Sequence, residues 1–184
     1  MNIILDKLPT DYEGLKIETN FRSFILFELL MQDKNINENN KVLLALNLFY
    51  KEAPKDIKKG IDGILWFYTR GNNEQNNKSN EKNNKKRIYS FEHDANFIYS
   101  AFLSQYKIDL NEIDYLHWWK FKTLFEGLND ENKICEIMGY RAVDLSKIKD
   151  KETKKKYKKL KQQWALPDER SEEEKENDFA EAFW

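Results

Sequence analysis

The fold is decided by the stretch Leu116-His117-Trp118-Trp119-Lys120-Phe121, which continues to Leu124-Phe125-Glu126-Gly127-Leu128. Apolar residues run through this stretch and through the residues before it at helical spacing, nearly all the way round the helix axis. A helix that is apolar on every side must be covered by other elements. We therefore predict a central, buried helix that is capped by Asp109 and ends near Leu128.

Further helical patterns lie on both sides of this stretch. Apolar residues recur every three or four positions in segments at about 20–33, 42–50, 54–70, 91–106, 130–138 and 150–166. Asn20, Ser90 and Asp150 precede three of these segments as helix caps. The first twenty residues place Pro9 and Gly14 between short apolar runs, a pattern typical of a hairpin. The predicted fold class is all-α: a helical bundle of about six helices, with a short β-hairpin at the N-terminus.

The length and the distribution of charge indicate one helical domain followed by an acidic segment. A chain of 184 residues can bury one sizeable core and is too short for two ordinary domains. We expect a single domain over residues 1–167, with subdomains of about 1–70 and 88–167 that flank an Asn-rich loop at 71–87. Residues 168–184 contain eight acidic and two basic side chains, which predicts a mobile acidic tail.

The composition limits the partners and the compartment. A formal net charge of −1 argues against a globally basic nucleic-acid-binding protein. Cys135 is the single cysteine, which fits a reducing compartment. No apolar run approaches the roughly 18 residues of a membrane span, and the first residues lack the pattern of a signal peptide. We expect a cytoplasmic protein with no membrane partner.

The sequence offers little to an enzyme interpretation. It contains no phosphate loop, nucleophile elbow or metal-ligand spacing, so we expect no catalytic, cofactor or metal site. His117 is the most suggestive residue, because Asp114 and Lys120 would share its face of a helix and could orient a catalytic base. With no second functional group in the pattern, a hydrogen-bonded structural histidine is the favoured interpretation.

Arg141 is a candidate anion-binding residue at a predicted helix end. Gly139 is well placed to end a helix in the left-handed conformation, so that Arg141 would leave the helix. A guanidinium presents a forked set of donors to a carboxylate or a phosphate. An internal carboxylate, at Asp144 or Glu126, is the favoured partner.

Two charged segments near the C-terminus are candidate binding surfaces. The lysine cluster of the last predicted helix is a candidate anion-binding patch, formed by Lys154, Lys155, Lys158 and Lys159. The acidic tail ends in three aromatic residues that could anchor in an apolar groove of a partner: Phe179, Phe183 and Trp184. A tail that only improves solubility is an equally good interpretation.

The chain resembles one family of small phage proteins, the bacteriophage gene-product-fifteen family, most specifically from residue 91 to about 166 and more loosely in its amino-terminal half. The resemblance rests on Phe-Glu-x-Asp-Ala at 91–95, Leu-His-Trp-Trp-Lys-Phe at 116–121 and Met-Gly-Tyr-Arg at 138–141. The residues of this family signature are expected to be architectural, and they are Leu116, His117, Trp118, Trp119, Phe121, Gly139, Tyr140 and Arg141. Neither the Asn-rich loop nor the acidic tail belongs to the resemblance.

The resemblance implies a role in phage tail assembly. Genes of the family lie in the tail-morphogenesis region of phages and prophages of Gram-positive bacteria, near those of the tail assembly chaperone and the tape-measure protein. The expected function is therefore that of a non-enzymatic tail assembly chaperone component in the bacterial host cell, with the tape-measure protein and another tail assembly chaperone as partners. Two alternatives stay open: a structural tail or connector subunit, and a helical nucleic-acid-binding regulator.

Overall fold

The computed structural model describes residues 2–72 and 87–167. These residues form seven helices and one two-stranded antiparallel hairpin, which confirms the predicted all-α class. In chain order the elements are β1 (Asp11–Tyr12), β2 (Leu15–Lys16), α1 (Phe21–Gln32), α2 (Glu38–Phe49), α3 (Ile57–Tyr68), α4 (Ala95–Tyr106), α5 (Trp118–Glu126), α6 (Lys133–Ala142) and α7 (Lys151–Gln163). None of the helices in the described ranges is long and apolar enough to cross a membrane.

Asn and Asp side chains cap the beginnings of four helices. In each of them an Asn or Asp before the first turn accepts a hydrogen bond from a backbone amide two or three residues further on, at Asn20, Asn37, Asp56 and Asp150. Such a cap satisfies one of the amides that the first turn of a helix leaves without a partner. The predicted caps Asn20 and Asp150 are therefore confirmed.

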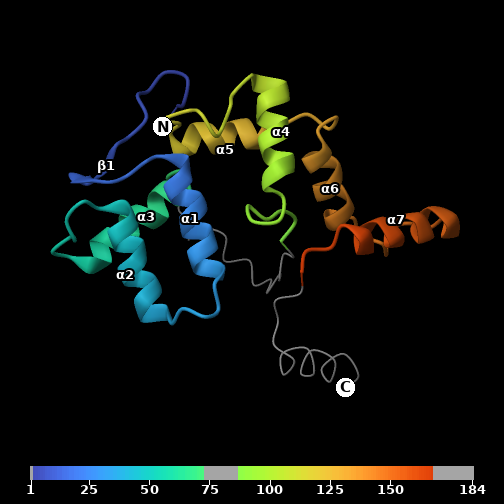
Figure 1. The fold of residues 1–184 in the computed structure, drawn as a ribbon, viewed down its shortest axis with the longest axis horizontal. Helices are drawn as coiled ribbons and strands as arrows, with labels where there is room; N and C mark the ends of the chain where they lie inside the picture. The colour runs from blue at the N-terminus through green and yellow to red at the C-terminus, as the bar shows by residue number, and fades with distance from the viewer. Residues whose placement is uncertain (1, 73–86, 168–184) are drawn as a thin grey trace.

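Helix α5 lies at the centre of the arrangement (Figure 1). It contacts α1 and α3 from the N-terminal half and α4 from the C-terminal half. Helices α1, α2 and α3 gather on one side of α5, whereas α6 and α7 lie on the other side, beyond α4. One cluster of buried residues, from Ile17 to Ile134, spans both halves. The central position that the apolar stretch predicts for this helix is confirmed.

A series of nearly parallel aromatic rings forms the middle of the core. Trp118 of α5 stacks on Phe24 of α1 with ring centroids 5.0 Å apart, and on Phe121 at 5.7 Å. Phe121 in turn stacks on Phe21 of α1 and on Phe102 of α4, each at 5.0 Å. Offset stacking of this kind adds to the burial of large apolar surfaces. The rings of α5 thus join α1 to α4.

The predicted start of the central helix is wrong. Helix α5 begins at Trp118, and Asp109 instead caps a turn, where its carboxylate accepts hydrogen bonds from the amides of Asn111 and Glu112. Just before Trp118 the chain is extended, because His117 pairs with Asn20 in an isolated antiparallel bridge. Apolar residues continue through this segment because part of it packs against the core. Helical periodicity alone therefore does not distinguish a helix from an extended chain here.

Two further helix ends differ from the prediction. Gly139 does not end α6, because the helix continues through Tyr140 and Arg141 to Ala142. The backbone amide of Val143 donates to the carbonyl of Gly139 at this end of the helix. Ser90 does not cap α4 directly. Its hydroxyl accepts hydrogen bonds from the backbone amides of Glu92 and His93, in a turn that precedes the helix. Helix α4 itself begins at Ala95.

Candidate functional site

The segment before α5 joins the two halves of the chain. The backbone amide of Phe21 donates to the carbonyl of Leu116 at 2.9 Å, and the amide of Trp118 donates to the carbonyl of Thr19 at 2.8 Å. These bonds form the bridge that holds α1 and α5 side by side at their first turns. Leu116 and His117 of the family signature are therefore placed at a junction within the fold, where both are buried.

Both ring nitrogens of His117 are used by this junction. Its Nδ1 accepts a hydrogen bond from the backbone amide of Trp119 at 3.0 Å, so the ring caps α5. Its Nε2 lies 3.0 Å from the carbonyl of Pro9, and this nitrogen must carry the proton because Nδ1 is an acceptor. Burial lowers the pKa of His117, and the charge of Lys120 lowers it further. The ring thus acts as a neutral helix cap, and Asp114, which precedes the helix, does not share its face.

This geometry makes the stability dependent on pH. Because the pKa of His117 is lower in the folded than in the unfolded chain, the unfolded chain binds more protons below a pH of about 6.5. The free energy of unfolding should therefore fall as the pH drops below that value, by up to about 1.4 kcal/mol per pH unit until the native pKa is reached. Urea unfolding at a series of pH values measures this slope.

The His117→Asn variant tests the origin of the slope. Asparagine is also a good helix cap but does not titrate, so the variant should be less stable at neutral pH and should lose the slope. His93→Asn, at a histidine that is partly exposed beside Glu92, should leave the slope unchanged. An equal slope in His117→Asn and the wild type would show that another group causes it.

The two tryptophans that follow His117 attach α5 to the end of α3. The indole N–H of Trp118 donates to the carbonyl of Tyr68 at 3.2 Å, and that of Trp119 donates to the carbonyl of Phe67 at 2.7 Å. The last carbonyls of a helix have no partner within the helix. Trp118 and Trp119 therefore donate hydrogen bonds to the end of α3, and their rings also pack in the core.

Arg141 of the signature is a buried connection between three segments. It forms a two-pronged pair with Asp94, with N–O distances of 2.5 and 3.0 Å, and both side chains are almost fully buried. It also donates to the carbonyl of Ile88 at 3.0 Å and to that of Trp164 at 2.6 Å. Arg141 thus ties α6 to the start of α4, to the chain before it and to the end of α7.

The internal partners that the sequence suggested for Arg141 are wrong. Glu126 instead pairs with Arg70 at 2.8 Å, and Asp144 accepts hydrogen bonds from Ser146. The true partner, Asp94, lies 47 positions away in the chain. Its place within Phe-Glu-x-Asp-Ala was a usable signal, because an aspartate inside an apolar segment needs a charged or polar partner when it is buried.

A polar cluster next to this connection was not foreseen from the sequence. Glu28 of α1 is buried and accepts a hydrogen bond from the hydroxyl of Tyr68 at 2.8 Å, and burial raises its pKa. Lys122 of α5 donates to the hydroxyl of Tyr89 at 3.3 Å and lies over the rings of Tyr89 and Trp118. Burial lowers the pKa of Lys122. Opposite shifts in a neighbouring acid and base are found at functional sites and also in structural networks.

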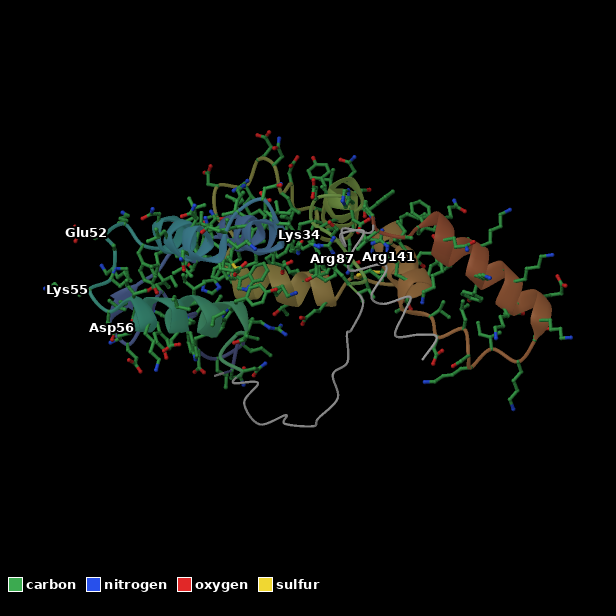
Figure 2. The ribbon with its side chains drawn as sticks, turned by 90° about the horizontal axis from the view of Figure 1, so that it is seen from below. Lys34, Glu52, Lys55, Asp56, Arg87 and Arg141 are labelled. Carbon is green, nitrogen blue, oxygen red and sulfur yellow. The ribbon has the colours of Figure 1, made fainter. Side chains whose placement is uncertain are left out.

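This cluster borders a cleft between α1 and the chain that follows α6. Its lining includes Glu28, Gln32, Arg87, Tyr89, Leu145 and Lys161. Arg87 and Arg141 both line this cleft and lie in the middle of the molecule (Figure 2). Glu52, Lys55 and Asp56 are at the opposite end, beyond α2 and α3. No group of three or more potential metal ligands is present among residues 2–72 and 87–167.

The lysine cluster lies on α7, where all four of its members are exposed: Lys154, Lys155, Lys158 and Lys159. Tyr157 and Leu160 of the same helix are half-buried. Trp164, which directly follows the helix, is also half-buried and packs edge-on against Phe97 of α4. The lysines therefore face away from the side of α7 that touches the fold. The three aromatic residues predicted to anchor the acidic tail, Phe179, Phe183 and Trp184, lie outside the described residues.

A second exposed surface lies on α2. Val42, Leu43 and Leu44 follow one another in the chain, and their exposed fractions are 36, 56 and 46 %. The helical spacing of residues 42–50 would place Val42 and Leu43 on the same side as Leu46 and Phe49, but both are exposed. The buried side is formed by Ala45, Leu46 and Phe49. Consecutive exposed apolar residues cost solubility and are typical of a binding surface.

Comparisons with known proteins give one match. Residues 4–166 match the family described as Bacteriophage Gp15 protein, so the match covers both halves of the fold and ends just beyond α7. No curated protein and no solved structure matches the chain. The match contains the cap at His117, the tryptophans of α5 and the Arg141–Asp94 pair, and it excludes residues 167–184.

Proposed function

Because this chain belongs to the bacteriophage Gp15 protein family, we propose that it acts in phage tail assembly, as a chaperone component that holds the tape-measure protein. The family context supports the setting, since genes of this kind lie beside those of the tail chaperone and the tape-measure protein. The proposed role is non-enzymatic. It requires a surface that binds another chain reversibly and makes or breaks no covalent bond.

The observation that carries this proposal is the exposed run Val42-Leu43-Leu44 on α2. A protein that keeps an aggregation-prone chain soluble must offer apolar side chains to it while remaining folded itself. In α2 the opposite side of the helix is buried against α1 and α3, so the exposed leucines sit on a firmly packed support. A rigid apolar surface binds a partner with little loss of side-chain entropy.

The surroundings of this run suit an apolar partner rather than a charged one. Lys41, the nearest lysine, is buried and its ammonium group is occupied by the carbonyl of Met31 at 3.1 Å and by Glu38 at 2.9 Å. Asn47 follows on the exposed side. The segment expected to bind here is an amphipathic helix of the tape-measure protein, whose apolar side would cover Leu43 and Leu44.

The direct test is co-expression with the tape-measure protein of the same phage or prophage. We expect the wild-type chain to keep the tape-measure protein soluble and to co-purify with it, and we expect it to be absent from finished particles. In Leu43→Lys/Leu44→Lys, the captured amount should fall at least tenfold while the melting temperature stays within a few degrees, because both positions are exposed.

A matched control separates this surface from exposed leucines in general. Leu65 and Leu103 have exposed fractions of 46 and 40 %, and they lie on α3 and α4. Leu65→Lys/Leu103→Lys should capture the tape-measure protein as well as the wild type does. Equal capture by both double variants would remove α2 from the proposal, and presence of the protein in finished particles would favour a structural subunit.

A further inference from the structure

Helix α7 projects from the body of the protein (Figure 1). It has no buried residue, and α6 is the described helix that it contacts most. The contact is narrow: Tyr157 meets Tyr140 edge-on, and Lys161 donates to the carbonyl of Val143 at 2.7 Å. Most of the α7 surface therefore faces solvent.

That exposed surface is strongly basic. Between residues 151 and 163 the helix carries seven lysines and one glutamate, a net charge of +6. None of these lysines has a carboxylate within salt-bridge distance among residues 2–72 and 87–167. Concentrating like charges on one helix is unfavourable, because lysines three and four positions apart repel each other. An anionic partner would relieve this repulsion.

The chain itself supplies an anionic segment close by. Residues 168–184 contain eight acidic and two basic side chains, a net charge of −6, which is equal and opposite to that of α7. The segment begins only five residues after the end of α7, and the carbonyl of Trp164 is held by Arg141 at 2.6 Å. Since α7 is about 20 Å long and 17 residues can span up to about 56 Å, the segment can reach every lysine of the helix.

A groove with a largely apolar lining lies next to the lysines. It runs between α6 and α7 and is lined by Cys135, Tyr140, Val143, Ile148 and Tyr157, together with the acidic residues Asp130 and Glu136. Glu136 is paired with Lys133 at 2.7 Å. The acidic segment carries its aromatic side chains at its far end, at Phe179, Phe183 and Trp184. The arrangement of charge followed by rings therefore matches a basic helix that has an apolar groove along its side.

We propose that residues 168–184 dock on α7 of the same molecule, with their carboxylates against the lysines and their aromatic side chains in the groove between α6 and α7. The tether gives the segment a high effective concentration, of the order of millimolar, so docking needs only weak intrinsic affinity. Docking covers the lysines and closes α7 to other polyanions. A second copy of the chain and nucleic acid are the competing occupants.

The test uses the full-length chain and a fluorescent synthetic peptide with the sequence of residues 168–184. A tail-neutralised variant carries Glu172→Gln, Glu173→Gln, Glu174→Gln and Glu176→Gln, which weakens docking of its own segment. By fluorescence anisotropy at about 50 mM salt, we expect this variant to bind the peptide at least tenfold more tightly than the wild type does. Binding should fall about tenfold or more on going to about 500 mM salt, because screening weakens exposed charge pairs.

Two sets of substitutions in the tail-neutralised chain locate the docking surface. Lys154→Gln, Lys155→Gln, Lys158→Gln and Lys159→Gln together should abolish peptide binding, and glutamine preserves helix propensity. The control set has the same charge change at exposed lysines far from α7 and should bind as before: Lys16→Gln, Lys51→Gln, Lys55→Gln and Lys58→Gln. Circular dichroism checks that both sets remain folded.

Four results would overturn the proposal. The first is equal peptide binding by the wild-type and tail-neutralised chains, and the second is equal binding by both lysine sets. The third is equal affinity of the wild-type and tail-neutralised chains for a DNA duplex of about 20 base pairs, since α7 would then be open to polyanions in both chains. A molar mass that doubles with concentration in the wild type, and not in the tail-neutralised variant, would assign the occupant to a second copy and also overturn docking within one molecule.

Discussion

Arg141→Ala is expected to lower the free energy of unfolding by about 3–5 kcal/mol, because it leaves the carboxylate of Asp94 buried without its cation. The loss is large against the roughly 5–15 kcal/mol that stabilises a typical domain. The variant also removes the donors to the carbonyls of Ile88 and Trp164. Urea unfolding followed by circular dichroism measures the change.

Comparison with an exposed pair shows why the effect is specific. Arg70 and Glu126 are as close, at 2.8 Å, but both are partly exposed, so Arg70→Ala should cost less than about 1 kcal/mol. Arg141→Lys should recover only part of the loss, because a single ammonium group cannot reproduce the forked pair with Asp94. A loss for Arg141→Ala no larger than that for Arg70→Ala would contradict the structural account.

The pair of Arg141 and Asp94 shows which features the sequence can predict and which it cannot. Periodicity located the helices, and the cap residues Asn20 and Asp150 located two of their beginnings, because both signals act within a few residues of one another. The partner of Arg141 is a long-range choice among many carboxylates. Asp94 is selected by the packing of α6 against α4, which no local pattern encodes.

In the segment before α5, a local pattern was itself misleading. Apolar spacing from Asp109 onward predicted one continuous helix, but the chain turns at Asp109 and is extended at His117. A segment that is paired with Asn20 and covered on the inside needs apolar residues as much as a helix does. Similarly, Leu43 lies three residues before the buried Leu46 and is still exposed, because periodicity indicates an apolar side of a helix without showing what covers it.

Family membership and exposed surfaces carry different parts of the functional argument. The match over residues 4–166 includes the connections made by His117, Trp118 and Arg141, and each of these side chains has its polar atoms directed at other parts of the same fold. Such residues stabilise the fold. Surfaces that bind partners must instead be sought among exposed side chains, which is why the proposals rest on α2 and α7.

Trp118→Ala is the second substitution with a large expected effect, about 3–5 kcal/mol, which is typical for removing a fully buried aromatic side chain. Trp118 is completely buried, and its ring stacks on Phe24, Tyr68 and Phe121. Truncation would leave a cavity at the point where α1, α3 and α5 meet. Thermal and urea unfolding should both show the loss, and the two halves of the chain should unfold at a lower denaturant concentration together, since one core cluster spans them.

Trp118→Phe divides this effect into packing and hydrogen bonding. Phenylalanine keeps a ring for stacking on Phe24 but cannot donate to the carbonyl of Tyr68, so we expect a smaller loss of about 1–2 kcal/mol. Leu103→Ala, at a position with an exposed fraction of 40 %, serves as the truncation control and should cost less than about 1 kcal/mol. If Trp118→Ala cost no more than Leu103→Ala, the stacked rings of α5 could not be the centre of the fold, and the helices on either side would have to be held together by the backbone bridge at His117 instead.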